Sequence, residues 1–514
     1  TTEIYTLSLH DALPISIGLD DAAQRLLQQL REAGDVELPG AIEATLRPYQ
    51  QRGYAWLYRN ARLGFGSVIA DDMGLGKTLQ VIATLQKLRD DGALDDAKAL
   101  VIVPTSLLTN WQKEIARFAP TLSVAVFHGT RRELATRQGA QRPDVLLTTY
   151  GIARSEAAAL KALAWRVLVV DEAQNIKNPA TAQTRAVKAI PAGSFIAMSG
   201  TPVENRLSEY WSIMDFANRG YLGRLPQFVK EYAVPIQTHR DQQAVERFRR
   251  VTAPFLLRRL KSDRTIIDDL PDKIEQDQYC SLSAAQSALY ESVVQEGLRV
   301  IAGESDTFRR QGLVLQMILA LKQICNHPAQ YLKQGQADAA LSGKAERFLE
   351  LIDEIHASHG KVLVFTQFRE MGELLAGWLR QRYAREPLFL HGGLARGRRD
   401  ALVERFQNDR TEQVFLLSLK AGGTGLNLTA ASSVIHYDLW WNPAVEAQAT
   451  DRAYRIGQQQ NVQVHRLITR ATFEERINDM IRAKRELAEL TVGSGEQWIG
   501  HLGRDELAAL FTLH

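Results

Sequence analysis

The chain has 514 residues, of which 45% are hydrophobic and 24% charged, and its formal net charge is +3. This length predicts at least two domains, and the near-neutral charge confines any nucleic-acid surface to a local patch. Cys280 and Cys325 lie far apart and no apolar run approaches ~18 residues, which argues against a disulfide framework, a zinc site and a membrane span.

Residues 1–16 are expected to be foreign to the protein. Tyr5–Ser16 (YTLSLHDALPIS) can be back-translated into a common sequencing-library adapter. We therefore predict an assembly artefact joined to a gene fragment whose true N-terminus is missing. Residues 17–45 are expected to be a linker or the remnant of a preceding region.

Residues 68–80 (VIADDMGLGKTLQ) predict a phosphate-binding loop between an apolar strand and an amphipathic helix. Gly74 and Gly76 let backbone amides turn toward phosphate oxygens, and the helix N-terminus attracts the same charge. Lys77 is expected to reach the β- and γ-phosphates of ATP, and Thr78 to bind Mg²⁺. The alternative is a glycine-containing loop that only ends a strand. The predicted ATP contacts in the loop are Asp72, Met73, Gly74, Leu75, Gly76, Lys77 and Thr78.

Asp71 stands where the general pattern GxxxxGK[ST] of such loops has its first glycine. Upstream, residues 46–57 (LRPYQQRGYAWL) contain Gln50, whose amide could pair with the donor and acceptor of adenine. The same segment also suits an ordinary helix start, so both interpretations of Gln50 stay open.

Two later strands of the first sheet end in pairs of hydroxyl residues. Thr105 and Ser106 either cap the following helix or contact DNA. Thr148 and Thr149 could donate hydrogen bonds to nucleic-acid phosphates at the C-terminal edge of a parallel sheet.

Residues 166–178 (RVLVVDEAQNIKN) predict a central strand followed by two adjacent acids, Asp171 and Glu172. Asp171 would bind Mg²⁺ and Glu172 would orient the attacking water. Adjacent acids also occur as solvated turn residues, but together with the phosphate-binding loop they predict nucleotide hydrolysis. A further strand ends in small residues suited to sensing a γ-phosphate, which are Ser199, Gly200 and Thr201.

The strings DDMGLGKT, DEAQ, SGTP and QATDRAYRIGQ occur in this order and closely resemble the sucrose-non-fermenting (SWI/SNF-type) family of superfamily-two, helicase-like ATPases. The resemblance covers residues 46–480. It implies an α/β fold of two RecA-like, doubly wound parallel-sheet lobes with helical insertions and a C-terminal brace helix. The implied parts are lobe 1 with a helical protrusion (46–255), a helical linker with a second protrusion (256–340), lobe 2 (341–473), the brace helix (474–490) and an unassigned tail (491–514).

Residues 207–334 are predicted to be mostly helical. The strings PFLLRRLKSD (254–263) and LKQICNHP (321–328) resemble insertions by which this family departs from simple helicases. Three basic residues of the first string either contact DNA or form a solvated face, and they are Arg258, Arg259 and Lys261.

After Gly360, four apolar strands alternate with helical segments, which predicts a second doubly wound lobe without a phosphate-binding loop. The resemblance implies that its strand ends contact the DNA backbone or couple to ATP, although Trp440 also suits a core. The implied DNA contacts are Thr366, Gln367, Gly392, Gly393, Ser418, Lys420 and Trp440, and the coupling residues are Gly423 and Gly425.

Residues 448–458 (QATDRAYRIGQ) place Arg452 and Arg455 three residues apart, on one face of a predicted helix. Two arginines at this spacing are usually a surface pair. The resemblance implies instead that both reach the γ-phosphate across a cleft between the lobes and that Gln448 contacts ATP.

The resemblance implies a monomeric motor, expected to come from a bacterium, that uses ATP and Mg²⁺ to move along double-stranded DNA. Its cargo would be RNA polymerase or another DNA-bound protein complex, and its location the cytoplasm, on the nucleoid in a bacterium. Three alternatives stay open. They are a strand-separating helicase on single-stranded DNA or RNA, a nucleotide-binding scaffold without turnover, and the motor of a larger machine whose targeting domain lies upstream.

Overall fold

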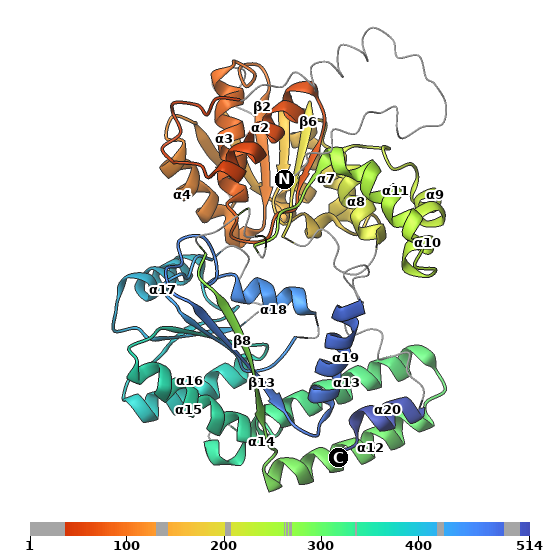
Figure 1. Ribbon diagram of the computed structural model, residues 1–514, viewed down its shortest axis with the longest axis vertical. Coiled ribbons are helices and arrows are strands. Elements are labelled where there is room, and N and C mark those ends of the chain that lie inside the picture. Colours follow the sequence, from red (N-terminus) through yellow and green to blue (C-terminus); the bar gives the residue numbers. More distant parts are fainter. Residues whose placement is uncertain are drawn as a thin grey trace. The chain divides into compact units, whose positions relative to one another are not determined.

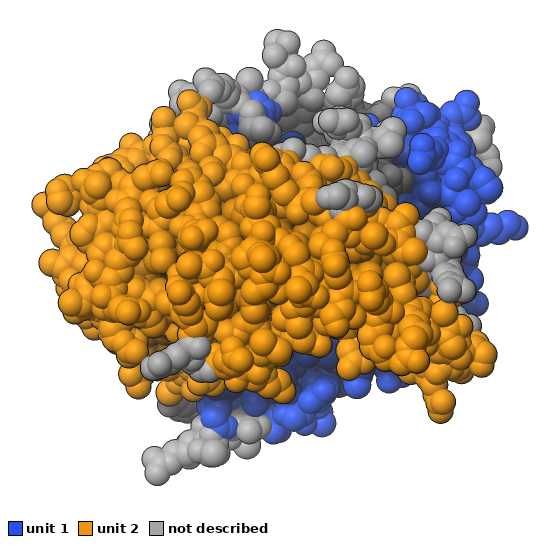
Figure 2. Space-filling view, turned by 90° about the horizontal axis from the view of Figure 1, so that it is seen from below, with its two compact units in different colours: residues 1–268 blue, residues 269–514 orange. Residues whose placement is uncertain are grey.

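The computed structural model describes residues 36–129, 142–200, 207–261, 263, 266, 270–334, 337–418, 426–440, 442–487 and 504–513. The chain divides into two compact units, residues 1–268 and 269–514 (Figure 2). Each unit is built around its own parallel sheet with helices on both faces (Figure 1). The predicted fold of two doubly wound α/β lobes is confirmed.

The sheet of the first unit has the strand order β3-β4-β2-β5-β6-β1-β7, and each neighbouring pair is parallel. Along β2, Leu100 and Ile102 face one core whereas Val101 and Val103 face the other. Burial on both faces explains why these strands are continuous apolar runs. The strands are β1 (Ser67–Ile69), β2 (Lys98–Val103), β3 (Val124–Phe127), β4 (Val145–Thr149), β5 (Trp165–Val170), β6 (Ser194–Met198) and β7 (Leu256–Leu257).

Helices cover both faces of this sheet. One face packs against α2 (Pro48–Leu63), α3 (Lys77–Asp90) and α4 (Leu108–Phe118). The core on the other face includes residues of the remaining described helices of the unit. These are α5 (Tyr150–Ser155), α6 (Ala157–Lys161), α7 (Ala182–Lys188), α8 (Leu207–Ala217), α9 (Leu225–Phe228), α10 (Val234–Gln237) and α11 (Gln242–Thr252). The helices of the predicted protrusion pack beside α8.

The sheet of the second unit has the strand order β10-β11-β9-β12-β13-β8, again with parallel neighbours. Its strands are β8 (Lys273–Cys280), β9 (Val362–Thr366), β10 (Leu388–Leu390), β11 (Val414–Ser418), β12 (Ser433–His436) and β13 (Val462–Thr469). One face packs against α15 (Gly343–Ala357) and α16 (Arg369–Tyr383), and the other against α17 (Arg396–Asn408) and α18 (Pro443–Thr450).

A separate helical core lies beside this second sheet. It contains α12 (Ala284–Gly303), α13 (Thr307–Asn326), α19 (Phe473–Leu487) and α20 (Arg504–Phe511), with the short α14 (Pro328–Tyr331) next to them (Figure 1). The rings of Phe473 and Phe511 lie 6.1 Å apart between centroids. The tail that had no predicted structure therefore contributes a packed helix, whereas the bracing role of α19 stays a prediction.

Two strands lie in the segment 256–340, which was predicted to be helical. β7 joins the first sheet beside β1, and β8 joins the second sheet beside β13. β8 is an edge strand with the sequence KIEQDQYC, and its first four residues are exposed. An edge strand with polar residues on both faces lacks the apolar pattern that identifies a strand. None of the helices in the described ranges has the length and apolar character that crossing a bilayer requires.

Candidate functional site

The loop predicted to bind phosphates connects β1 to α3. Gly74 and Gly76 have φ angles of 81° and 75°, a conformation that glycine adopts without strain. Gly76 is the N-cap of α3, so Lys77 and Thr78 are the first two residues of the helix. The loop therefore ends at a helix N-terminus, where unpaired amides and the helix dipole favour an anion.

Lys77 lies over the start of this loop. Its Nζ donates to the carbonyl oxygens of Asp71 and Asp72, at 2.5 Å and 3.1 Å. A Cβ on Gly200 would lie 2.6 Å from Cγ of Met73, so the residue after Ser199 contacts the loop directly. Gly200 of the predicted coupling segment is thus a neighbour of Met73 in the predicted phosphate-binding loop. Thr201 lies outside the described residues.

Asp171 follows β5 and is buried. Trp111 Nε1 donates to its Oδ2 at 2.8 Å, and the Glu172 amide donates to its Oδ1 at 2.8 Å. Burial raises the pKa of Asp171, while these two hydrogen bonds and the charge of Lys77 act to lower it. Each carboxylate oxygen keeps a further lone pair, so Asp171 fits the role of a Mg²⁺ ligand together with the Thr78 hydroxyl and substrate phosphates.

Glu172 is linked by hydrogen bonds to Ser199, at the end of β6. Its φ of 52° is unusual for a residue with a side chain, and such strain is often found at functional sites. Gln174 Nε2 donates to Glu172 Oε2 at 2.7 Å, and Ser199 Oγ donates to Gln174 Oε1 at 3.3 Å. A hydrogen-bonded path therefore joins Ser199 to the carboxylate predicted to orient water.

Gln50 lies against the same loop with its side chain 4% exposed. Its Nε2 donates to the Leu75 carbonyl at 3.2 Å, and its Oε1 accepts from the Arg47 amide at 2.9 Å. The second bond belongs to the start of α2, as the helix-start interpretation expects. Adenine recognition by Gln50 stays a prediction.

Arg259 was missed as a residue of this site. Both interpretations weighed for it, a DNA contact and a solvated face, are wrong, because its side chain is 9% exposed and pairs with the fully buried Asp71. The signal in the sequence was Asp71 itself, since a buried carboxylate needs a partner. Arg258 is exposed, so its two interpretations stay open.

The hydroxyl pairs of the first unit differ in exposure. Thr105 and Ser106 are exposed and neither caps a helix, so the capping interpretation is wrong and DNA contact stays a prediction. Thr148 is fully buried and its hydroxyl donates to the Phe127 carbonyl at 2.9 Å, so the prediction that it contacts nucleic-acid phosphates is wrong. Thr149 caps α5 by accepting from the Ile152 amide at 3.4 Å, and its DNA contact stays a prediction.

In the second unit, Asp438 organises the end of β9. Thr366 Oγ1 donates to Asp438 Oδ2 at 2.5 Å, and the Gln367 amide donates to Oδ1 at 2.8 Å. Thr366 is 1% exposed, so the prediction that it contacts DNA is wrong. Gly392 and Gly393 are exposed, while Gln367 and Trp440 are half-buried and Ser418 is buried. Lys420, Gly423 and Gly425 lie outside the described residues.

Arg452 and Arg455 do not share a helical face, because α18 ends at Thr450 and both arginines lie in the turns that follow. Arg455 Nη1 donates to the Leu426 carbonyl at 3.3 Å, and the Arg452 carbonyl accepts from the Leu428 amide at 2.9 Å. Gln448 is half-buried on α18. The tight turns end the helix at Thr450, five residues before Arg455, and the roles of these side chains stay predictions.

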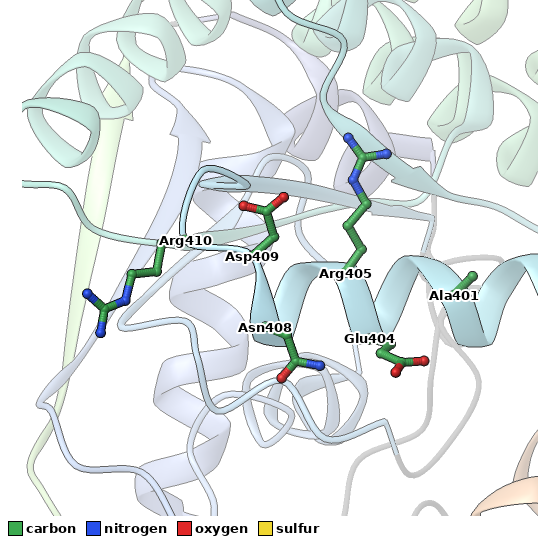
Figure 3. Close-up of a pocket in the computed structure, with 6 residues that line it drawn as sticks. All are labelled: Ala401, Glu404, Arg405, Asn408, Asp409 and Arg410. Carbon is green, nitrogen blue, oxygen red and sulfur yellow. The ribbon is translucent and has the colours of Figure 1, made fainter.

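A hollow at the C-terminal end of α17 contains none of the predicted site residues. Figure 3 shows that its side chains point in different directions and do not converge on one point. Arg405 pairs with Glu412, and Asp409 accepts from Thr411 Oγ1 at 2.6 Å. These local contacts explain the lining without a ligand. The lining residues are Ala401, Glu404, Arg405, Asn408, Asp409 and Arg410.

Two family models match the chain. Residues 49–330 match the SNF2-related domain, and residues 343–457 match the helicase conserved C-terminal domain. Both matches include residues discussed above, with Lys77 and Asp171 in the first and Arg452 and Arg455 in the second.

Several known proteins are similar over most of the chain. YwqA of Bacillus subtilis, provisionally named an ATP-dependent helicase/translocase, is 44% identical over 506 residues, which are 97% of this chain and 54% of YwqA. The TATA-binding protein-associated factor MOT1 of Saccharomyces cerevisiae is 31% identical over 553 residues, which are 94% of this chain and 30% of MOT1. The chain spans about half the length of the bacterial relatives that it matches.

Among solved structures, the SWI2/SNF2 ATPase core of Sulfolobus solfataricus in complex with dsDNA is 42% identical. The match covers 94% of this chain and 100% of that one, with a TM-score of 0.46.

Proposed function

The chain belongs to the SNF2-related family, and we propose that it is an ATP-driven translocase on double-stranded DNA that remodels or displaces DNA-bound protein complexes. The observation that carries the proposal is the arrangement around the phosphate-binding loop. Lys77 lies at the N-terminus of α3, and its charge acts on the buried Asp171 at the end of β5. A cation and a carboxylate at such a loop suit the binding of Mg²⁺-ATP.

In the proposed reaction, water attacks the γ-phosphorus of ATP, and the bond from this phosphorus to the bridging oxygen of ADP breaks. Gly74, Gly76 and Lys77 hold the phosphates. Thr78 and Asp171 would hold Mg²⁺, which would neutralise charge on the phosphates. Glu172 orients the water. The hydrogen bonds from Glu172 through Gln174 to Ser199 would let loss of the γ-phosphate alter the hydrogen bonding of Ser199.

The second unit would complete the catalytic site. We propose that Arg452 and Arg455 stabilise the charge that develops on the transferred phosphoryl group, so neither unit hydrolyses ATP efficiently alone. Arginines in this role typically raise kcat by ~10³ to 10⁵. Each cycle of binding and hydrolysis would then alter how the two units engage DNA.

The proposed DNA contacts are sequence-independent. Thr105 and Ser106 in the first unit, and Gly392 in the second, are exposed and offer hydroxyl or amide donors to phosphates. Gly393 is exposed as well, but its amide donates to His391 Nδ1 at 3.3 Å. Relatives named TATA-binding protein-associated factors support a cargo that is itself a DNA-bound protein. RNA polymerase is one such cargo. We propose that the motor works as a monomer.

ATP hydrolysis by residues 17–514 tests this proposal, measured without nucleic acid and with duplex DNA, single-stranded DNA or RNA. Glu172→Gln provides the inactive control. Stimulation mainly by duplex DNA supports the translocase, and stimulation only by single strands or RNA favours the strand-separating helicase. Hydrolysis equal to that of Glu172→Gln under all conditions would support the scaffold. Affinity for duplex should fall steeply with salt if several phosphates are contacted.

A further inference from the structure

Asp71 and Arg259 form a buried ion pair at the start of the phosphate-binding loop. Arg259 Nε donates to Asp71 Oδ1 at 2.9 Å, and Nη2 donates to Oδ2. The backbone amide of Arg259 also donates to Oδ1, at 3.0 Å. A guanidinium bound by both of its edge donors to one carboxylate fixes the orientation of both groups.

The same guanidinium contacts two helices that flank the loop. Its Nη2 donates to Gln80 Oε1 on α3 at 2.7 Å, and its Nη1 donates to the Tyr49 carbonyl on α2. The guanidinium carbon lies 5.0 Å from the centre of the Tyr49 ring. Arg259 therefore joins α2, the loop and α3 at one point.

The backbone around Arg259 is bound to the loop as well. The Asp72 amide donates to the Arg259 carbonyl at 3.0 Å, and the Lys261 amide donates to Asp72 Oδ2 at 2.9 Å. Space for the guanidinium is provided by Gly53 on α2, where a Cβ would lie 2.8 Å from Arg259 Nη2 and 1.9 Å from Gln80 Oε1. The contacts are thus specific to an arginine in this position.

We propose that Arg259 is a positioning residue of the ATP site, which acts through Asp71 to hold the loop in its phosphate-binding conformation. The proposal rests on the proposed ATP hydrolysis. It explains why the first glycine of the usual pattern is replaced by an aspartate, since the carboxylate anchors the loop. Lys77 Nζ donates to the carbonyl of this same Asp71 at 2.5 Å, so the anchored residue also holds the lysine that would reach the phosphates.

A purely structural ion pair makes a different prediction. Removing it would lower the stability of the first unit but leave nucleotide affinity unchanged in the molecules that remain folded. A positioning role predicts that affinity falls in folded protein, because the amides and Lys77 are no longer preorganised.

The test compares ADP binding by the full chain and by its variants, because ADP binding requires neither DNA nor turnover. Asp71→Asn with Arg259→Gln removes both charges, so that neither is left buried without a partner. The matched control is Lys188→Gln with Asp215→Asn, a mostly buried pair in the same unit with 2.8 Å between Nζ and Oδ2. Folding is checked by circular dichroism and thermal melting.

We expect the Asp71/Arg259 double variant to bind ADP about tenfold more weakly, with KM for ATP raised by a similar factor. The control should melt at a lower temperature and keep the wild-type Kd. Gly53→Ala, which keeps both charges but displaces the guanidinium, should weaken ADP binding in the same direction. Arg259→Lys should recover part of the affinity that Arg259→Gln loses.

Wild-type ADP affinity in either the folded double variant or folded Gly53→Ala would overturn the positioning role. The outcome is separable from that of the proposed function. A wild-type chain that binds ADP but shows no DNA-stimulated hydrolysis would contradict the translocase and leave the role of Arg259 testable. A wild-type chain that binds no ADP would overturn both.

Discussion

Trp111 donates its indole N–H to Asp171, with 2.8 Å between Nε1 and Oδ2. Both side chains are buried, and they come from different elements, because Trp111 lies on α4 whereas Asp171 follows β5. The bond fixes the plane of the carboxylate that we propose as a Mg²⁺ ligand. A helix on one face of the sheet thus orients a residue at the C-terminal end of a central strand.

Trp111→Phe should reduce kcat for ATP hydrolysis by roughly tenfold, because a hydrogen bond to a charged group contributes ~1.5–3 kcal/mol and its loss frees the carboxylate to turn. The variant should also require more Mg²⁺ for half-maximal activity. Steady-state hydrolysis measured across a range of Mg²⁺ concentrations checks both effects.

Trp165→Phe is the matched control for this variant. Its indole also donates one hydrogen bond in the same unit, to the Leu160 carbonyl at 2.7 Å, but away from the loop. Equal Mg²⁺ dependence in the two variants would show that Trp111 only contributes to packing.

Replacing Thr105 and Ser106 by alanine should weaken binding to duplex DNA by roughly 30-fold, since two hydrogen bonds of ~1 kcal/mol each are at stake. Stability should change little, because both side chains are exposed. Fluorescence anisotropy with labelled duplex, without nucleotide, measures the affinity.

For Thr148→Val we expect the opposite result, a loss of stability without a loss of DNA affinity. The Thr148 hydroxyl is buried and bonded to the Phe127 carbonyl, so its removal should cost about 1 kcal/mol of unfolding free energy and leave DNA affinity unchanged. A loss of DNA affinity in folded Thr148→Val would restore this residue as a DNA contact.

These threonines show where sequence interpretation of the site succeeds and fails. The phosphate-binding loop and the Asp171–Glu172 pair were recognisable because the residues that carry the chemistry are neighbours in the chain. The exposure of side chains at strand ends was not recognisable from the sequence. Successive residues of a strand face opposite sides, and the sequence does not show whether a hydroxyl has a hydrogen-bond partner within the protein. Thr148 and Thr366 look like DNA contacts in sequence, yet both hydroxyls are bonded internally.

Arg259 and β8 illustrate the limits set by distance along the chain. Arg259 pairs with an aspartate 188 residues away, and no local pattern identifies that partner. β8 pairs with a strand 189 positions later, Lys273 opposite Val462, and its polar sequence conceals it. Most of the other strands are apolar runs that alternate with helical segments, which is why the two-lobed fold was predictable although the order of the strands in each sheet was not.

His436 should make the second unit less stable in mild acid. Burial, aided by the charge of Arg466, lowers the pKa of His436 to about 3. Below pH ~6.5 the unfolded chain binds a proton that folded His436 does not, so stability decreases as pH falls, by ~1.4 kcal/mol per pH unit from this residue alone. The decrease should continue until the pH approaches the folded pKa.

Urea unfolding between about pH 7 and pH 5 measures this slope. His436→Leu should remove about 2 kcal/mol of the stability that the wild type loses over this range, because the full slope is reached only below about pH 5.5. His359→Asn is the control, because His359 is exposed and its φ of 54° suits asparagine. The same slope in His436→Leu as in the wild type would contradict the prediction.

Arg455→Lys should lower DNA-stimulated kcat by ~10³ or more, because a lysine keeps the charge but not the guanidinium fork proposed to stabilise the transferred phosphoryl group. ADP affinity should stay near the wild-type value, since the proposed contact is with the γ-phosphate. Arg380→Lys, on an exposed arginine of the same unit, serves as the control. Unchanged kcat in Arg455→Lys would remove this residue from the proposed catalytic site.

The most direct test of the proposed function is displacement of a third DNA strand from a duplex by the full chain. A triplex-forming oligonucleotide is released by a motor that moves along double-stranded DNA, and the two strands of the duplex need not separate. We predict ATP-dependent release that Glu172→Gln abolishes, with no separation of a forked duplex under the same conditions. Separation of the fork without triplex release would contradict the translocase and identify a strand-separating helicase.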